Sequence, residues 1–403
     1  MSTLSERILG APAGAYVDRE VDMAFAHDGT GVLTREALRE MGVEQLPHPE
    51  RLRLVFDHIV PANTGTTATL QAELRGYARA SGIDLSDAGG GICHQVMSEG
   101  VVRPGMVVVG ADSHTCTLGA LGAFATGVGA TDMAAIWASG ATWFRVPETI
   151  AVNLTGRLGG PAEPKDVALA CVARLGMEGA TYRALEFVGD GAATISMDGR
   201  LTLCNMAVET GAKTGIFYAD AVTVRHLAGH GVAASPQAVE EPRYEREIAI
   251  DLSGIVPLVA VPHRVDTVRE AEDVAGTPID QVFVGTCTNG RYEDLARLAR
   301  IVRGRKVAVR TLVVPASRAV LARAIATGVL ADIVDAGCMV APPGCGPCLG
   351  AHEGVMGEGE VCLSTANRNF KNRMGVGAEI YLSSVATAAA SALAGETAVP
   401  EGA

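Results

Sequence analysis

Two cysteines lie three positions apart between prolines and glycines, in the segment PPGCGPCLG. Cys345 and Cys348 form the only C-x-x-C spacing in the sequence, and Cys287 lies upstream in an equally tight turn, GTCTNG. Such a pair fits a redox motif, a zinc site or an iron–sulfur cluster. A structural zinc needs four nitrogen or sulfur ligands, and no second pair is present. A cubane cluster takes thiolates and favours glycine close to its sulfides, so these residues favour a cluster.

Three thiolates would leave one iron of a four-iron cluster without a protein ligand, and an open metal position can bind and polarise a substrate oxygen. Cys338 and Cys362 flank the pair and are alternative fourth ligands, which would make the cluster a closed, electron-transferring one. The other four cysteines read as small buried hydrophobic residues: Cys93, Cys116, Cys171 and Cys204.

Adjacent acidic and basic side chains suit proton handling. Asp57 and His58 are neighbours in FDHIVP, and a carboxylate can hold an imidazole in one tautomer and raise its pKa. A purely structural pair has the same sequence. Arg368 and Arg373 could form a fork for a carboxylate, with surface salt bridges as the alternative, and Glu209 would by default be a solvated acid on a helix.

The last third of the chain alternates between strand and helix patterns. Residues 282–285 (VFVG) predict a buried strand, followed by a turn (TCTNG) and an amphipathic helix (RYEDLARLARIVRG). A second strand over 306–314, a helical stretch over 317–337 and a loop follow. This alternation predicts a parallel sheet, with the cysteines just past the carboxyl ends of its strands, where open α/β sheets bind ligands.

The earlier parts repeat this organisation. GMVVVGADSHT predicts a strand that runs into a polar turn, with a glycine- and alanine-rich helix starting near Gly119. ETIAVNLTG and EIAIDLSG predict strands at the two ends of the middle part, with PKDVALACVARLG as a helix between them. Strands that end beside proline place domain limits at 1–147, 148–263 and 264–403.

Composition narrows the class of protein. The sequence has 403 residues, 48% of them hydrophobic, which predicts several globular domains with large cores. It has no apolar run of membrane-spanning length, and MSTLSERILG does not resemble a secretory signal, so we expect a cytosolic protein without membrane contact. Nine cysteines are then expected to be reduced thiols. The net charge of -12 argues against nucleic-acid binding.

Four longer motifs carry a resemblance to a known family: GADSHTCTLGALGAFATGVGATD, VGTCTNGRYEDL, PGCGPCLG and NRNFKNRMG. With them the chain resembles, from residue 26 to 395, the large subunits of 3-isopropylmalate dehydratase and homoaconitase, which are iron–sulfur hydro-lyases of the aconitase family. The resemblance implies a three-domain α/β/α architecture with the active site at the domain junction and without the family's swivel domain.

The same resemblance assigns roles residue by residue. It implies Cys287, Cys345 and Cys348 as ligands of a [4Fe-4S] cluster with one non-cysteinyl iron, and Asn205 and Asn367 beside that cluster. The implied catalytic groups are Asp57, His58, His94, Asp112, His114 and Glu209, and the implied substrate contacts are His27, Ser113, Arg368 and Arg373. Two positions depart from the family pattern: Asn372 replaces a usual glycine and Leu118 a common aromatic residue.

The resemblance further implies a reaction, a substrate class and a partner. The reaction is dehydration and rehydration of a hydroxy di- or tricarboxylic acid, with 2- and 3-isopropylmalate in leucine biosynthesis as the main expectation. Homoaconitate and a citramalate- or dimethylmalate-type acid are the alternatives. A separate small subunit with the swivel domain is expected to bring the serine base, because this sequence ends where that domain would begin. A cluster-containing RNA-binding sensor is the rival from another class, and the acidic charge weighs against it.

Overall fold

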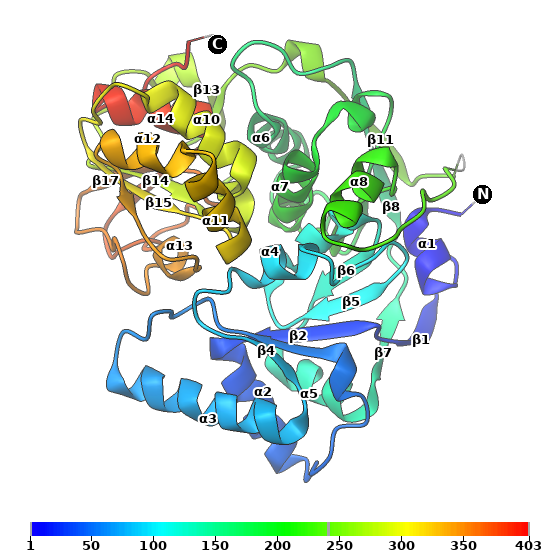
Figure 1. The fold of residues 1–403 in the computed structure, drawn as a ribbon. Coiled ribbons are helices and arrows are strands. Elements are labelled where there is room, and N and C mark those ends of the chain that lie inside the picture. Colours follow the sequence, from blue (N-terminus) through cyan, green and yellow to red (C-terminus); the bar gives the residue numbers. More distant parts are fainter. Residues whose placement is uncertain (1, 240–241, 402–403) are drawn as a thin grey trace.

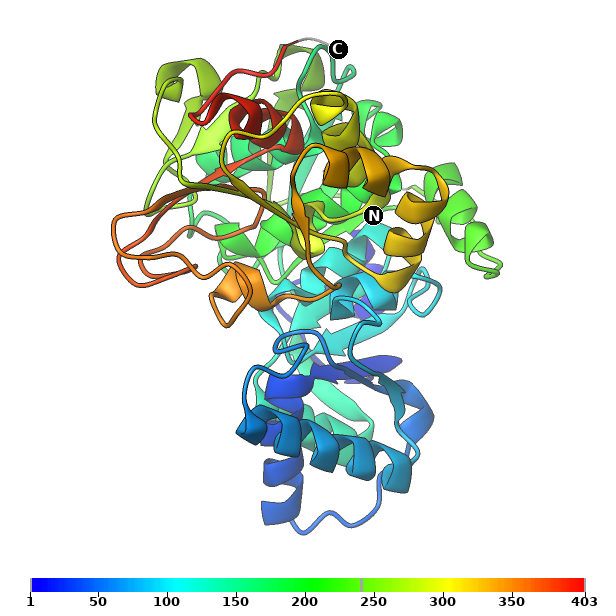
Figure 2. The ribbon, with the colours of Figure 1, turned by 60° about the vertical axis from the view of Figure 1, so that its left-hand side comes forward.

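The computed structural model describes residues 2–239 and 242–401. Three larger sheets with helices packed around them form the chain, and they follow one another in sequence (Figure 1). The N-terminal part, blue to cyan, lies at the bottom of Figures 1 and 2, and the C-terminal part, yellow to red, lies above it. This arrangement confirms the predicted α/β class.

The first sheet has five parallel strands in the order β4-β3-β2-β5-β6. These strands are β2 (Met23–His27), β3 (Leu52–Val55), β4 (Asp84–Ser86), β5 (Val107–Gly110) and β6 (Phe124–Gly127). The helices of this part are α1 (Leu4–Leu9), α2 (Asp28–Glu40), α3 (Gly65–Ser81), α4 (Cys93–Ser98) and α5 (Ala130–Ser139). An antiparallel ribbon pairs β1 (Tyr16–Glu20) with β7 (Ala141–Arg145). The central strand β2 is buried at every position, as expected for a parallel strand covered on both faces.

The second sheet has four parallel strands in the order β10-β9-β8-β11. These strands are β8 (Thr149–Thr155), β9 (Ala184–Val188), β10 (Thr214–Phe217) and β11 (Arg246–Asp251). Its helices are α6 (Pro164–Leu175), α7 (Met197–Ala207) and α8 (Ala221–Gly229). The two strands and the helix that the sequence predicted here are β8, β11 and α6, and α6 starts at a proline whose missing N–H costs nothing in the first turn.

The third sheet has seven strands in the order β13-β12-β18-β17-β14-β15-β16, of which β12 runs antiparallel to both neighbours. These strands are β12 (Leu258–Ala260), β13 (Val268–Glu270), β14 (Gln281–Gly285), β15 (Arg310–Val314), β16 (Met339–Val340), β17 (Val361–Ser364) and β18 (Glu379–Ser383). The helices are α9 (Thr286–Asn289), α10 (Tyr292–Val302), α11 (Arg318–Ala326), α12 (Val329–Asp335), α13 (Gly346–Leu349) and α14 (Val385–Ala394).

Helix α10 shows why the sequence pattern predicted a helix after the strand. Its buried residues follow the 3.6-residue period: Leu295, Leu298, Ala299 and Val302. The expected turn TCTNG contains the short helix α9, and the helical stretch over 317–337 is two helices separated by Gly328, which adopts a left-handed φ of 77°. The domain limits at 147 and 263 stay a prediction.

One prediction about the first part is wrong. No helix starts near Gly119 in the described structure: a 3-10 segment covers Ser113–Leu121, strand β6 follows, and the helix α5 begins only at Ala130. A Cβ on Gly119 would lie 1.9 Å from the carbonyl oxygen of Gly215, so this glycine permits close approach to the second sheet. Small residues buried on all sides produce the same pattern in a helix and in a buried strand, which explains the error.

The three sheets share a continuous core. One cluster of buried apolar side chains includes Phe25 of the first sheet, Leu154 of the second and Phe283 of the third. Side chains from all three parts therefore fix the relative positions of the loops between them. Within the described residues, the helices are too short or too polar to cross a membrane.

Candidate active site

Five of the predicted site residues lie at or just past the carboxyl ends of strands from two sheets. His27 ends β2, Asp57 follows β3 and Asp112 follows β5. In the third sheet Cys287 follows β14, and Asn367 follows β17. Because the strands within each sheet are parallel here, their carboxyl ends share one edge, and the folds of the first and third parts bring these two edges together.

Asp57 and His58 form a buried ion pair, with His58 Nδ1 2.7 Å from Asp57 Oδ1. The second oxygen of Asp57 accepts the backbone N–H of Cys93 at 2.7 Å. Burial lowers the pKa of His58, but the carboxylates of Asp57 and Asp112 outweigh it and raise that pKa to about 9. The ring of His27 stacks on His58 at 3.6 Å between centroids, and burial together with His58 lowers the pKa of His27 to about 4. At neutral pH one ring of the stack is therefore protonated and the other is neutral.

Asp112 lies at the centre of three histidines. Its Oδ1 is 2.9 Å from His94 Nε2 and accepts the backbone N–H of His114 at 2.7 Å, and its Oδ2 is 3.7 Å from His58 Nε2. Burial raises the pKa of Asp112, but His94, His114 and His58 together lower it well below its usual range. Asp112 is therefore a carboxylate that joins the imidazoles to one network.

Glu209 extends this network to an arginine. Its Oε1 lies 2.8 Å from His114 Nε2 and accepts a hydrogen bond of 2.8 Å from Arg368 Nε. Glu209 follows α7 in a short 3-10 turn and is only 7% exposed. The default expectation of a solvated helix acid is wrong, because the turn directs this carboxylate inward, between His114 of the first part and Arg368 of the third.

The Cys287 thiol faces two asparagine side chains. Asn205 Nδ2 donates to Cys287 Sγ at 3.1 Å, and Asn367 Nδ2 lies 3.7 Å from the same sulfur. Asn367 also donates to Asn205 Oδ1 at 3.2 Å, which fixes both amides. Thr286, just before Cys287, has a φ of 74°, a left-handed conformation that a β-branched residue rarely adopts. Such local strain clusters at functional sites.

Cys345 and Cys348 lie in the loop before and within α13. The Cys345 N–H donates to the carbonyl oxygen of Asp57 at 2.6 Å, which ties the cysteine loop to the Asp57–His58 turn. Arg373 Nη2 lies 3.6 Å from Cys348 Sγ, and Asn367 Oδ1 lies 3.8 Å from it. The hydrogen bond from Cys345, helped by Arg373, lowers the pKa of Cys348 well below its usual range, which favours a thiolate.

The three thiols do not fit a single metal ion. Four sulfur atoms around one zinc at 2.3 Å lie about 3.8 Å apart. In the described part of the chain, the residues whose ligand atoms all lie within 4.8 Å of one another are His27, Asp28, Asp57 and His58, not the cysteines. That acidic and basic group is already occupied by hydrogen bonds among its own side chains and to backbone N–H groups.

The cysteine site does fit a polynuclear iron–sulfur cluster. The sulfur atoms of the three cysteines are not all close enough to one another to bind a single ion. A cluster avoids this limit, because each thiolate binds a different iron. Polar donors point at the sulfur atoms of Cys287 and Cys348. A Cβ on Gly346 would lie 2.2 Å from His352 Nε2, so this glycine lets the His352 ring pack against the loop between the two cysteines. Arg373 Nε is buried and has no partner among the described groups, which suits a ligand at this place.

Cys338 and Cys362, the alternative fourth ligands, are both buried. Cys338 belongs to the core between the third sheet and its outer helices, a different cluster from that of Cys345. Cys362 lies on β17, where burial raises the pKa of its thiol to about 12. All nine cysteines are free thiols in the described structure, as expected for a reduced protein.

The structure keeps one predicted residue apart from this network. Ser113 is exposed and lines a hollow of ≈ 620 Å³ together with Trp143, Tyr182 and Lys213. Its neighbours Asp112 and His114 point into the histidine network instead. The turn between them therefore presents alternate side chains to opposite sides.

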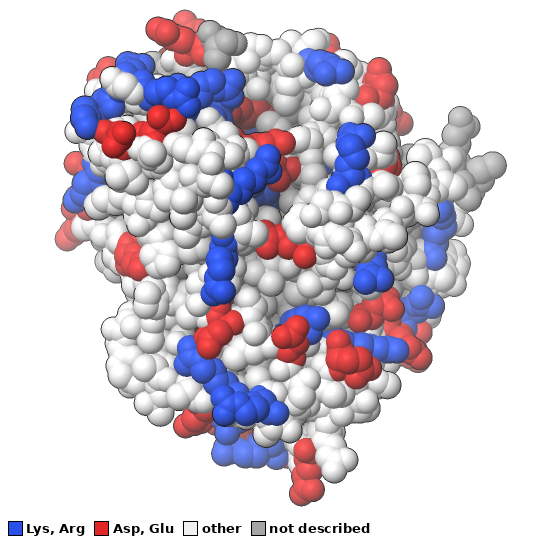
Figure 3. Space-filling model, viewed as in Figure 1, with Lys and Arg blue, Asp and Glu red and all other residues white. Residues whose placement is uncertain are grey.

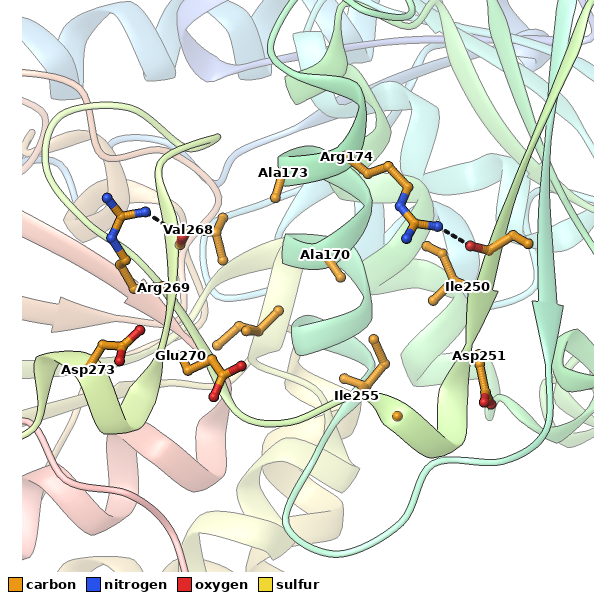
Figure 4. Close-up of a pocket in the computed structure, with 13 residues that line it drawn as sticks. Ala170, Ala173, Arg174, Ile250, Asp251, Ile255, Val268, Arg269, Glu270 and Asp273 are labelled. Atoms are coloured by element: carbon orange, nitrogen blue, oxygen red, sulfur yellow. Dashed lines mark hydrogen bonds between the residues drawn. The ribbon is translucent and has the colours of Figure 1, made fainter.

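A second hollow, of ≈ 700 Å³, lies between α6, β11 and β13 (Figure 4). Figure 4 shows Arg174 and Arg269 around this hollow together with Asp251 and Glu270, so it is lined by both basic and acidic side chains. All thirteen lining residues lie outside the predicted site. The hollow is thus a surface feature apart from the chemistry.

Lys165 is a buried residue that sequence reasoning missed. Its Nζ donates to the carbonyl oxygens of Thr365 at 2.8 Å and Ala366 at 2.6 Å, just before Asn367. Burial lowers the pKa of Lys165 to about 7. Lys165 lies in the first turn of α6, and only the packing of that helix on the third part supplies its two acceptors.

Arg291 is a second missed residue and joins all three parts of the chain. Its side chain donates to the carbonyl oxygens of Cys287 and Thr288 and, 3.1 Å away, to Gln95 Oε1 on α4. It also donates to Thr202 Oγ1 on α7 at 3.2 Å. The one available signal was its place in the motif that contains Cys287.

The departures from the family pattern have a structural explanation at one position. Asn372 has a φ of 65°, a left-handed conformation that glycine adopts freely and asparagine tolerates best among the others. Its Oδ1 also accepts the N–H of Gly377 at 3.0 Å. Leu118, where an aromatic residue is common in the family, is fully buried in the core.

Comparison with known proteins defines the class. The model of the aconitase family (aconitate hydratase) matches residues 6–275 and 265–395. The chain therefore belongs to the aconitase family.

Individual relatives cover nearly the whole chain. It is 52% identical to the probable methanogen homoaconitase large subunit of Methanosarcina mazei, over 94% of this chain and 98% of that protein. It is 47% identical to 3-isopropylmalate dehydratase large subunit 1 of Methanopyrus kandleri, over 99% of this chain and 98% of that protein. Among solved structures, aconitase X of Thermococcus kodakaraensis in its holo-form matches with a TM-score of 0.52 at 13% identity, over 87% of this chain and 84% of that one. This last likeness supports the fold alone.

Proposed function

We propose that this chain is the cluster-bearing large subunit of a hydro-lyase that interconverts 2-isopropylmalate and 3-isopropylmalate by dehydration and rehydration in leucine biosynthesis. The observation that carries the proposal is the hydrogen bond from Cys345 to Asp57, which brings the cysteine loop beside the protonated His58. A proton donor and a site for a Lewis acid are what removal of a hydroxyl group from a hydroxy acid requires.

Cys287, Cys345 and Cys348 would hold the cluster, and the Nδ2 groups of Asn205 and Asn367 would donate hydrogen bonds to the Cys287 thiolate. A [4Fe-4S] cluster in this place would supply a Lewis-acid iron without a cysteine ligand, which binds and polarises a substrate oxygen. The pKa of Cys348, held low by Cys345 and Arg373, would prepare one ligand in its thiolate form.

The substrate has two carboxylates that need cationic partners. Arg373 has an unpartnered buried Nε beside the cysteines, and Arg368 is held by Glu209 at the edge of the histidine network. A guanidinium can bind a carboxylate through two parallel hydrogen bonds. We assign both arginines to substrate binding, with His27 as a neighbouring contact. For Ser113, which faces the opposite side of its turn, a substrate contact stays a prediction from the resemblance alone.

The proton-handling groups form three carboxylate–histidine pairs. His58, paired with Asp57, is protonated at neutral pH and can donate a proton to the departing hydroxyl group. Asp112 lies beside both His58 and His94. Burial lowers the pKa of His94, but Cys93 and Asp112 outweigh it and raise that pKa well above its usual value. His114 and Glu209 form the third pair, in which the carboxylate fixes the orientation of the imidazole ring.

The base that removes the carbon-bound proton is assigned to a partner. The relatives are named large subunits, which supports a small subunit that carries the swivel domain. Closure by that subunit would exclude water from a site whose groups His58 and Asp112 are now partly exposed. Nine free thiols suit a reducing cytoplasm.

Homoaconitase activity is the second candidate, because the relatives' names divide between the two activities. The substrate's side chain would then end in a carboxylate instead of an isopropyl group. A citramalate- or dimethylmalate-type acid would use the same chemistry. Against an RNA-binding role stand the net charge of -12 and the mixed acidic and basic side chains on the face in Figure 3.

The test is an assay of the anaerobically reconstituted chain, alone and with a small swivel-domain subunit from the same organism. We expect turnover of 3-isopropylmalate only in the mixture, because general-base assistance contributes about 10²–10⁴ in rate and we assign that base to the partner. Homoaconitate, citramalate and dimethylmalate serve as the comparison panel. Turnover by the chain alone at ordinary enzyme rates, or a mixture that dehydrates none of these acids, would contradict the proposal.

A further inference from the structure

Asp28, the first residue of α2, is surrounded by hydrogen-bond donors. Its Oδ1 accepts the backbone N–H groups of Asp57 at 3.2 Å and His58 at 2.8 Å, and its Oδ2 accepts that of Ile59 at 2.9 Å. Gln71 Nε2 on α3 donates to Oδ2 as well, at 3.2 Å. Three consecutive amides of one turn thus wrap around a single carboxylate that is 5% exposed.

This arrangement arises from the sheet. β2 and β3 are adjacent and parallel, with His27 opposite Val55, so Asp28 and the residues after β3 leave the sheet at the same edge. The turn at 57–59 has left the strand ladder, and buried amides there need another acceptor. Asp28 supplies it from the neighbouring strand.

The turn that Asp28 holds carries two contacts of the proposed site. It places the His58 ring against Asp57 and His27, and it presents the Asp57 carbonyl oxygen to the N–H of Cys345. We propose that Asp28 is a positioning residue: its carboxylate sets the backbone of residues 57–59 and thereby the place of His58 relative to the cysteine loop. This inference deepens the proposed function and rests on it for the catalytic part only.

The chemistry of the carboxylate makes asparagine a sharp probe. All four groups around Asp28 are N–H donors, so an amide NH₂ in place of one oxygen would face a donor instead of accepting from it. Asp28→Asn keeps the size of the side chain and removes half of its accepting capacity. Asp28→Glu restores both oxygens at a greater reach and tests for partial rescue.

A matched control lies at the other end of strand β2. Asp22 immediately precedes β2, and its Oδ2 accepts the backbone N–H of Val107 at 2.7 Å. Asp22→Asn makes the same change of charge and the same loss of a carboxylate–amide contact at the other end of the sheet, away from His58.

The experiment uses the cluster-loaded chain, with hydrogen–deuterium exchange of the peptide that contains residues 57–59 and activity with the small subunit as its two readouts. We expect exchange at 57–59 to rise at least about tenfold in Asp28→Asn. kcat should fall by about 10²-fold with a small change in KM, because a displacement near 1 Å has that effect. Asp22→Asn should leave both unchanged, and Asp28→Glu should lie between.

Unaltered exchange at 57–59 in Asp28→Asn would overturn the proposal. So would rapid exchange of these amides in the wild-type chain, a measurement that needs no variant to fold. Faster exchange with undiminished kcat would overturn the link from the turn to the chemistry. If no hydroxy acid is turned over by the wild-type mixture, the proposed function fails, while the exchange result still decides the role of Asp28 in the turn.

Discussion

Replacement of Arg291 by methionine tests how the three parts of the chain are held around the Cys287 turn. Methionine keeps most of the length and apolar contact of the side chain but removes every donor. The guanidinium is 1% exposed and donates to Gln95 on α4, to Thr202 on α7 and to the carbonyl oxygens of Cys287 and Thr288. Each of the three parts therefore loses a partner in this single change.

The magnitude follows from the groups that are left without a donor. Hydrogen bonds to a charged group contribute about 1.5–3 kcal/mol each, but such contributions are not additive within one network. Thr202 Oγ1 keeps its hydrogen bond to Thr288 O, so it is partly compensated, whereas Gln95 Oε1 and the Cys287 carbonyl oxygen lose a donor. We expect Arg291→Met to lower the free energy of unfolding by about 3–5 kcal/mol, as for other broken buried ionic contacts.

The charge of Arg291 also acts on Asp294. Burial raises the pKa of Asp294 to about 7, and Arg291 is the main group that opposes this rise. Without the guanidinium the pKa of Asp294 should increase further, so this group binds a proton more readily in the folded state. The stability difference between Arg291→Met and the wild type should therefore narrow as pH falls to about 7 and stay constant below it, where Asp294 is protonated in both proteins.

The assay is urea unfolding of the cluster-free chain, followed by iron and sulfide content after anaerobic reconstitution. Arg300→Met is the control, because Arg300 is an exposed arginine on the same helix α10. Arg291→Lys should give an intermediate loss, because an ammonium group cannot reach all these acceptors at once. If Arg291→Met changes stability by less than about 1 kcal/mol and binds a full cluster, the reasoning from these contacts is wrong.

Three further outcomes are expected. Replacement of both Cys345 and Cys348 by serine should abolish the brown colour and the iron content of the reconstituted chain, and a cluster that survives would exclude these ligands. Arg373→Lys should raise KM for the hydroxy acid several-fold through loss of charge-assisted hydrogen bonds of about 1.5–3 kcal/mol, with cluster absorbance retained; equal loss of absorbance would mark the residue as structural. The folded pKa of His58 lies above its usual value, so its pairing with Asp57 should stabilise the cluster-free chain fully below about pH 6.5 and lose that effect as pH rises to about 9. In urea unfolding across this range, Asp57→Asn should flatten the dependence, and an unchanged slope would contradict the assigned pairing.

The sequence by itself determined the fold class and the kinds of residue at the site. Strand and helix periods around residues 281–302 were readable because one face of α10 is buried and β14 is buried throughout. The resemblance carried by the cysteine and Asp112–His114 motifs identified the family, which the comparisons confirm. The roles of the individual site residues stay predictions.

The tertiary structure decided what those residues touch. Glu209 is a buried partner of His114 and Arg368 only because the 3-10 turn after α7 directs it between two parts of the chain. The helix expected near Gly119 is absent from the described structure because a close approach to Gly215 and a short strand occupy that place.

Buried charges were the least visible features in the sequence. Lys165 lies in the first turn of α6 and Arg291 is the N-cap residue of α10, and the acceptors of both include residues far along the chain. Asp28 is separated by about thirty positions from the amides that it accepts. Local sequence fixes the period and the caps of an element, but the partner of a buried charge depends on which other element packs against it, and that is a property of the assembled core.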